Sequence, residues 1–137
     1  MGITTEVNTV QWGAADSKSV ALSTSENADD YTFDVTCVQA VIQLKVDNAG
    51  TPVDGDTVDF YASLKGDPDN DSTDEYDTVG NFLTTLDTYA TSGGTDPCVK
   101  SMAFYPLPGQ TYRFIADNQS AASAMTVSMQ ITEMKVA

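Results

Sequence analysis

The stretch that decides the fold is AMTVSMQITEMKVA, residues 124–137. Apolar side chains occupy every second position from Met125 to Ile131, and threonine, serine and glutamine occupy the positions between them. A β-strand points successive side chains to opposite faces, so this alternation predicts a strand with one buried and one exposed face. The phase shifts near Glu133, which predicts that Met134 and Val136 also point inward.

The same alternation recurs over most of the chain. Apolar residues take the odd positions in residues 31–37 and the even positions in residues 38–46, so a single buried face requires a bulge or bend near Cys37 and Val38. In residues 56–66 the alternation points Tyr61 outward. Residues 82–94 also fit one helical face, but their threonines favour a strand. Strands are expected within eight segments, namely 3–12, 19–23, 31–46, 56–66, 82–94, 95–110, 111–119 and 124–137.

This series of strands predicts an all-β fold of about eight strands. The expected architecture is an antiparallel β-sandwich, jelly-roll-like, with an immunoglobulin-like strand order as the alternative. The 137 residues suit a single domain. Within it, residues 1–30 are expected to supply N-terminal strands and a polar arm, and residues 31–137 the sandwich body.

The charge of the chain restricts its partners. It has 20 acidic and 6 basic residues, a net charge of −14, and no two basic residues lie near each other in sequence. Nucleic acids and anionic membranes require clustered positive charge, so neither is expected as a partner. The start of the chain, MGITTEVNTVQWG, lacks the basic and apolar regions of a signal peptide, and no apolar run approaches the length of a membrane span.

The side-chain inventory argues against catalysis. The chain has no histidine, which removes the commonest general base and every Ser-His-Asp or Cys-His arrangement. We therefore expect a protein that is not an enzyme. Cys37 and Cys98 are expected to be buried and free, with a disulfide across the sandwich as the alternative.

One acidic loop is a candidate metal site. GDPDNDSTDEYD, residues 66–77, begins like an EF-hand loop, but Ser72 and Thr78 stand where that loop requires glycine and glutamate. Clustered carboxylates repel one another, and a hard cation would relieve the repulsion. A solvated hairpin end is the first interpretation, a calcium site the second and a catalytic carboxylate pair the third. The candidate calcium ligands are Asp67, Asp69, Asp71, Asp74 and Glu75.

Three aromatic residues are candidate interface anchors. They are Trp12, Tyr105 and Tyr112. Tyr105 and Tyr112 could also stack on a sugar, and each of the three could instead pack in or close the core. The outward residues of the last strand form a neutral stripe, which could pair with another subunit without burying charge or simply face solvent. The members of this stripe are Thr126, Ser128, Gln130 and Thr132.

Three stretches resemble the small virion proteins of tailed phages: VDNAGTPVDGDTVDFYASLKGD, DEYDTVGNFLTTLDT and YRFIADNQSAASAMTVSMQITE. Over roughly residues 31–135 the chain resembles capsid decoration (cement) proteins and some tail or neck proteins. The resemblance implies a β-sandwich, often a homotrimer, made in the host cytoplasm and seated on the major capsid protein of the virion. Its implied function is to stabilise the capsid by bridging subunits. The alternatives are a carbohydrate- or receptor-binding β-sandwich module and a tail or neck component.

Overall fold

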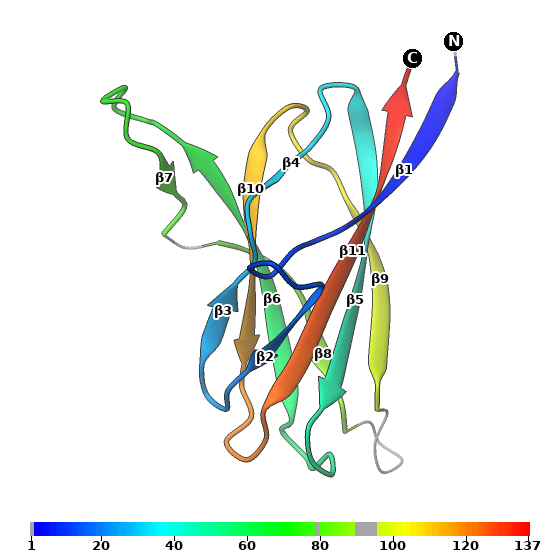
Figure 1. Cartoon of the computed structure of the whole chain (residues 1–137), viewed down its shortest axis with the longest axis vertical. Coiled ribbons are helices and arrows are strands. Elements are labelled where there is room, and N and C mark those ends of the chain that lie inside the picture. The colour runs from blue at the N-terminus through cyan, green and yellow to red at the C-terminus, as the bar shows by residue number, and fades with distance from the viewer. Residues whose placement is uncertain (1, 79, 90–95) are drawn as a thin grey trace.

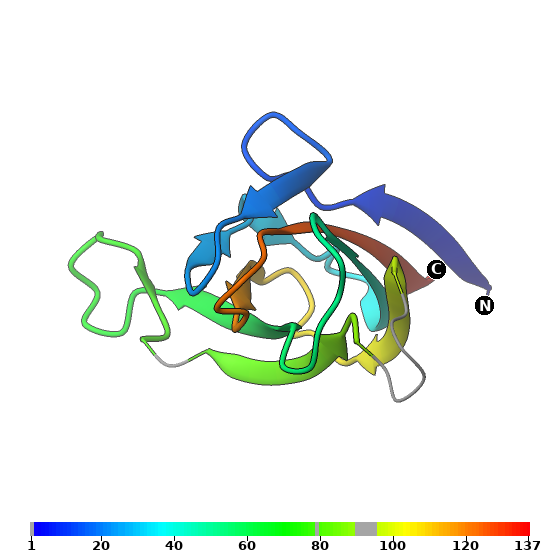
Figure 2. The same ribbon diagram turned by 90° about the horizontal axis from the view of Figure 1, so that it is seen from below.

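The computed structural model of the protein describes residues 2–78, 80–89 and 96–137. These residues form two antiparallel sheets that face each other (Figure 1). Seen from below, the two layers curve around a common core, with both termini on one side and the loop after β6 projecting on the other (Figure 2). Among the described residues no helix is long and apolar enough to cross a membrane.

The first sheet is built on the two longest strands. Its order is β1, β11, β5 and β9, and β2 also pairs with β11, next to the position where β1 ends. The bounds are β1 Ile3–Thr9, β2 Ser17–Val20, β5 Cys37–Asn48, β9 Cys98–Phe104 and β11 Met125–Val136.

The second sheet runs in the order β3, β10, β6 and β7, with β4 also on β10 and β8 also on β6. The bounds are β3 Ser25–Asn27, β4 Tyr31–Thr32, β6 Thr57–Gly66, β7 Glu75–Tyr76, β8 Asn81–Asp87 and β10 Thr111–Asn118. The expected antiparallel β-sandwich is therefore confirmed. The described residues form eleven strand segments where about eight were expected. A turn splits the expected strand 31–46 into β4 and β5, and the short strands β3 and β7 lie where no strand was expected. Residues 90–94 of the expected strand 82–94 lie outside the described residues.

The bend expected near Cys37 and Val38 is present. It is a turn between β4 and β5, in which the amide of Cys37 donates a hydrogen bond to the carbonyl of Asp34 at 3.0 Å. The turn exposes 76% of Val35, so the inward position that alternation predicts for this residue is wrong. Cys37 is buried and Cys98 half-buried, and both are free thiols, which excludes the disulfide alternative.

The core lies between the sheets and consists of the alternate residues of each long strand. Near the turn before β5 it holds a cluster of aromatic rings, in which Phe33, Phe104 and Tyr112 lie 5.4 to 5.6 Å apart by ring centroids. Along β11 the inward phase continues through Glu133, which is only 3% exposed. Met134 and Val136 pair with Thr5 and Ile3 on the opposite, outward phase, so their predicted inward position is wrong.

A buried carboxylate closes the other end of the sandwich. Asp56, which is 2% exposed, accepts hydrogen bonds from Ser120 Oγ at 2.7 Å, Asn48 Nδ2 at 3.0 Å and the amide of Val53 at 3.0 Å. Burial alone would raise the pKa of this carboxyl, but these three donors outweigh burial and lower it. Asp56 therefore ties the turn after β5 to the loop after β10.

We expect Asp56→Asn to destabilise the fold by about 1–3 kcal/mol, because the NH₂ group that replaces one carboxylate oxygen would face the donors from which that oxygen accepts. Since the pKa of Asp56 is lowered by folding, its contribution to stability is present above the unfolded pKa and is lost as the pH falls through the lower folded pKa. The variant should thus lose less stability than the wild type on acidification below pH about 4. Urea unfolding at pH 7 and at pH 3 measures both effects, with Asp54→Asn as the exposed control. Equal stability of Asp56→Asn and wild type would contradict this role.

Candidate functional site

A row of large side chains, half-buried on two strands and exposed on the third, crosses the outer face of the second sheet. On neighbouring strands, Ile115 of β10 pairs with Tyr61 of β6, and Tyr61 pairs with Phe82 of β8. Phe82 is 58% exposed, and the rings of Tyr61 and Phe82 meet edge to face with centroids 5.7 Å apart and planes at 71°. We refer to Ile115, Tyr61 and Phe82 as the aromatic row.

The aromatic row depends on an irregularity in strand pairing. The register between β6 and β8 shifts between Phe60 and Tyr61, which brings Phe82 to the outward side beside Tyr61. Gly80 lets the chain enter β8 this close to β6, because a Cβ at that position would lie 3.2 Å from the Cβ of Tyr61 and 3.3 Å from the carbonyl of Ala62. The alternating sequence pattern correctly predicted that Tyr61 points outward, whereas no sequence pattern predicted that Phe82 lies beside it.

Polar groups border the aromatic row on both sides. On one side Thr85 Oγ1 donates to Asp59 Oδ1 at 2.5 Å. On the other side the guanidinium of Arg113 lies 3.6 Å from the ring centroid of Tyr76, and its buried Nε has no hydrogen-bond partner among the described residues. A hydrogen bond from Tyr76 to Asp30 raises the pKa of the phenol above its usual value. This border places a carboxylate, a hydroxyl and a guanidinium beside the row.

The acidic loop projects from the edge of the same sheet (Figure 1). It leaves β6 five residues after Tyr61 and returns through β7 towards β8. Four of the five candidate ligands are brought together, with carboxylate oxygens within 4.8 Å of one another: Asp67, Asp69, Asp71 and Glu75. The fifth, Asp74, turns away and forms an ion pair of 3.2 Å with Lys65. Clustered carboxylate oxygens are the ligands that calcium prefers, so the arrangement is compatible with Ca²⁺.

The three candidate interface anchors have different environments. Trp12 and Tyr112 are buried, with 3% and 6% exposure, and belong to the core, so neither can serve as a surface anchor. Tyr105 is 72% exposed but lies far along the chain from the aromatic row, after β9. None of the three belongs to the aromatic row.

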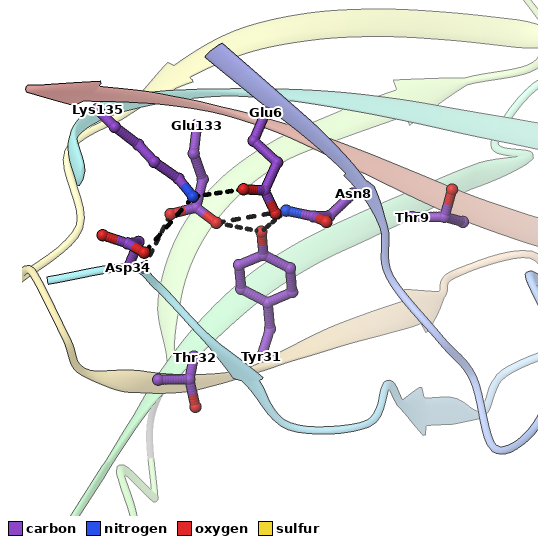
Figure 3. Close-up of a pocket in the computed structure, with 8 residues that line it drawn as sticks. All are labelled: Glu6, Asn8, Thr9, Tyr31, Thr32, Asp34, Glu133 and Lys135. Carbon is purple, nitrogen blue, oxygen red and sulfur yellow. Dashed lines mark hydrogen bonds and ion pairs between the residues drawn. The ribbon is translucent and has the colours of Figure 1, made fainter. Parts of the chain in front are cut away.

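A polar cleft of about 350 Å³ opens near the termini, between β1, β11 and β4 (Figure 3). At its base the buried carboxylate of Glu133 accepts hydrogen bonds from the phenol of Tyr31 at 2.7 Å and the amide of Asp34 at 2.9 Å. Lys135 bridges the carboxylates of Glu6 and Asp34. These hydrogen bonds and ion pairs therefore join β1 and β11 to β4 and to the turn before β5.

Charged side chains that line the cleft are paired with one another. The ammonium of Lys135 lowers the pKa of Glu6, and Glu6 in turn raises the pKa of Lys135. Burial, reinforced by the hydrogen bond to Glu133, raises the pKa of Tyr31 well above its usual value, so Tyr31 remains a donor at all physiological pH values. Because the principal polar groups are already paired, the cleft is better explained as a structural clamp than as a binding site.

We expect Tyr31→Phe to destabilise the fold by about 1–3 kcal/mol, because it leaves the buried carboxylate of Glu133 without its phenol donor. Thermal and urea unfolding measure the loss. Tyr105→Phe removes the same atom from an exposed ring and should be nearly neutral. Equal losses of unfolding free energy in the two variants would show that the hydrogen bond of Tyr31 does not stabilise the fold.

The sequence matches no protein-family model. It also matches no curated protein. Among solved structures, the chain is similar to the CBM36-1 domain of a multidomain xylanase from the hindgut metagenome of Trinervitermes trinervoides, with 10% identity, a TM-score of 0.49 and 98% of each chain covered. It is similar to the C-terminal CBM6 of LamC, a marine laminarinase from Zobellia galactanivorans, with 14% identity, a TM-score of 0.48 and coverage of 93% of this chain and 99% of that one.

A third similar structure is a carbohydrate-binding module CBM36 in complex with calcium and xylotriose, with 8% identity, a TM-score of 0.47 and coverage of 95% of this chain and 99% of that one. These three neighbours are carbohydrate-binding β-sandwich modules, and they match the carbohydrate-binding alternative better than capsid decoration. The resemblance to phage decoration proteins is therefore wrong. The homotrimer, the capsid partner and the virion location rest on that resemblance alone and stay untested predictions. At such low identity the likeness assigns no ligand to this chain.

Proposed function

We propose that the protein is a non-catalytic carbohydrate-binding module whose ligand lies across the aromatic row. The observation that carries this proposal is the contact between exposed Phe82 and half-buried Tyr61 on the outer face of the second sheet. One face of a pyranose ring presents C–H groups, which pack on an aromatic face, while its hydroxyls extend sideways to polar groups. Asp59, Thr85 and Arg113 border the row at the positions where such hydroxyls would lie.

The geometry of the rings favours a single glycan chain over a flat crystalline surface. A crystalline polysaccharide presents coplanar sugar rings, which require coplanar aromatic side chains. Here the two ring planes differ by 71°, so successive sugars on them would have to be rotated relative to each other. A soluble, twisted chain meets this requirement.

The electrostatics favour an uncharged glycan. The chain carries a net charge of −14, and both Asp59 and the acidic loop lie on or beside the proposed binding face. A polyanionic glycan would be repelled. The basic groups nearby are engaged within the protein, Lys65 by Asp30 and Asp74 and Arg113 by the ring of Tyr76.

We expect Phe82→Ala to weaken binding to a soluble neutral polysaccharide by about tenfold, because it removes an exposed ring that stacks on the ligand. Affinity electrophoresis against soluble xylan, β-glucan and galactomannan identifies a ligand, and calorimetry with its oligosaccharides gives the affinity. Tyr61→Ala should have a similar effect.

Tyr105→Ala is the matched control, since it removes another exposed ring away from the aromatic row. Binding that Tyr105→Ala reduces and Phe82→Ala leaves unchanged would move the site elsewhere. A complete lack of binding across the panel of neutral glycans would refute the proposed function.

The acidic loop is proposed to bind one calcium ion through Asp67, Asp69, Asp71 and Glu75. Two of these carboxylates also shape the loop, since Asp67 accepts from the amides of Asp71 and Ser72, and Asp71 accepts from the amide of Thr73. Folding of the loop thus brings like charges together, and a hard cation would offset their repulsion. A bound ion would stiffen the connection between β6 and β8, which carry the aromatic row.

We expect the melting temperature to rise by about 3–8 °C in millimolar CaCl₂ relative to EDTA, because an ion that binds only the folded state stabilises it. Asp69→Asn should abolish most of this shift. Asp74→Asn should retain it, because Asp74 pairs with Lys65 outside the group of four. Equal melting temperatures of the wild type in CaCl₂ and EDTA would show that the loop is a solvated hairpin end.

A further inference from the structure

The outer face of the first sheet differs in composition from the rest of this acidic protein. Register places the outward side chains of β1, β11, β5 and β9 in rows across the four strands. One row consists of Val7, Thr132, Val41 and Ala103, and the next consists of Thr9, Gln130, Gln43 and Ser101. We call the outward residues of these four strands the neutral face.

Charge is nearly absent from the neutral face. Among its described residues only Lys45 and Asp47 are charged, and both lie in the half away from the termini. The half near the termini instead exposes apolar side chains. Ile3 is 65% exposed, Val7 56% and Val41 36%. Val136 and Met134, both half-buried, pair with Ile3 and Thr5. These apolar side chains lie among threonines and glutamines that carry no charge, so this half of the face is suited to contact with a partner.

We propose that the neutral face binds the same face of a second copy of this chain, forming a symmetric dimer of sandwiches. Two copies that each carry a net charge of −14 repel each other in most orientations. They can approach with the least repulsion through faces that carry no carboxylate in the contact. The apolar half of the neutral face provides such a contact. A two-fold axis would bring this half of one copy against the same half of the other copy.

The size of the face predicts a weak dimer. Strands about 4.8 Å apart, with residues spaced by about 3.3 Å, give a whole face of roughly 600 Å², because β1 and β9 have 7 residues each and β5 and β11 have 12. Each partner of a standard interface buries about 800 Å², so contact over most of this face would give a small interface and a reversible association. Two sheets packed face to face at about 10 Å would interdigitate valine, threonine and methionine side chains, as the two inner faces of a sandwich do.

Other occupants fit the neutral face less well. The half near the termini has no aromatic ring on which a sugar could stack and no basic residue that could contact an anionic membrane. A basic protein would be drawn to the acidic loop, which lies on the other side of the molecule from the termini (Figure 2). Self-association therefore uses one sheet and leaves the aromatic row on the other sheet free for ligand.

Sedimentation equilibrium of the full chain from 1 to 500 µM tests the proposal. We expect a reversible monomer–dimer equilibrium that becomes tighter as NaCl is raised from 20 to 500 mM, because salt screens the repulsion between the acidic copies. Val41→Asp should weaken dimerisation at least tenfold, since symmetry places two new carboxylates in the interface. Val53→Asp makes the same change at an exposed valine of the β5–β6 turn and should leave dimerisation unchanged.

Ala103→Glu, on the edge strand β9, repeats the test in case Val41→Asp does not fold. A wild type that stays monomeric throughout, or a dimer that neither Val41→Asp nor Ala103→Glu weakens, would overturn the proposal. The proposed dimer and the proposed function can fail independently, because Val41→Asp should keep the glycan affinity of the wild type and Phe82→Ala should keep its dimerisation.

Discussion

The pairing of β5 with β11 is the constraint on which the rest of the structure depends. The two strands of 12 residues each run antiparallel at the centre of the first sheet, from Asn48 opposite Met125 to Cys37 opposite Lys135. In this register Ile42, Leu44 and Val46 point inward beside Ile131, Met129 and Val127, and all six are buried. A slip of one residue would move this entire apolar set to the surface. One register therefore determines both the core and the neutral face.

The two outer faces of the sandwich follow from different local chemistry. On the first sheet, strict alternation leaves threonine, glutamine and valine outside, which gives a regular surface nearly free of charge. On the second sheet, the register shift between Phe60 and Tyr61 and the close approach at Gly80 gather two rings and their polar border in one place. A regular surface suits contact with a similar surface, whereas an irregular one with grouped aromatic and polar side chains suits a small ligand.

Alternation in the sequence was enough to predict the sandwich and the outward position of Tyr61, because burial of one face imposes a period of two directly. It could not place Phe82, whose orientation depends on a register shift between strands, or Met134, whose phase depends on where the bulge falls between β11 and β5. The sequence also showed that acidic residues cluster in residues 66–77. Which of their carboxylates converge depends on the backbone of the loop, because Asp74 pairs with Lys65 and does not join the four carboxylates that lie together. The resemblance to phage proteins failed because alternating strands and Asp/Gly turns are common to many sandwiches and do not specify a partner.

The polar cleft near the termini has a volume of about 350 Å³, yet volume is the weaker argument for binding. A ligand entering the cleft would have to replace the bonds of Tyr31 to Glu133 and of Lys135 to Glu6, and each exchange would gain little. At the aromatic row, Phe82 already exposes apolar surface to water, and covering it with a sugar breaks no bond within the protein. The Asp59–Thr85 pair and the guanidinium of Arg113 border this surface with polar groups. The free energy available for binding is therefore greater at the open sheet face than in the cleft.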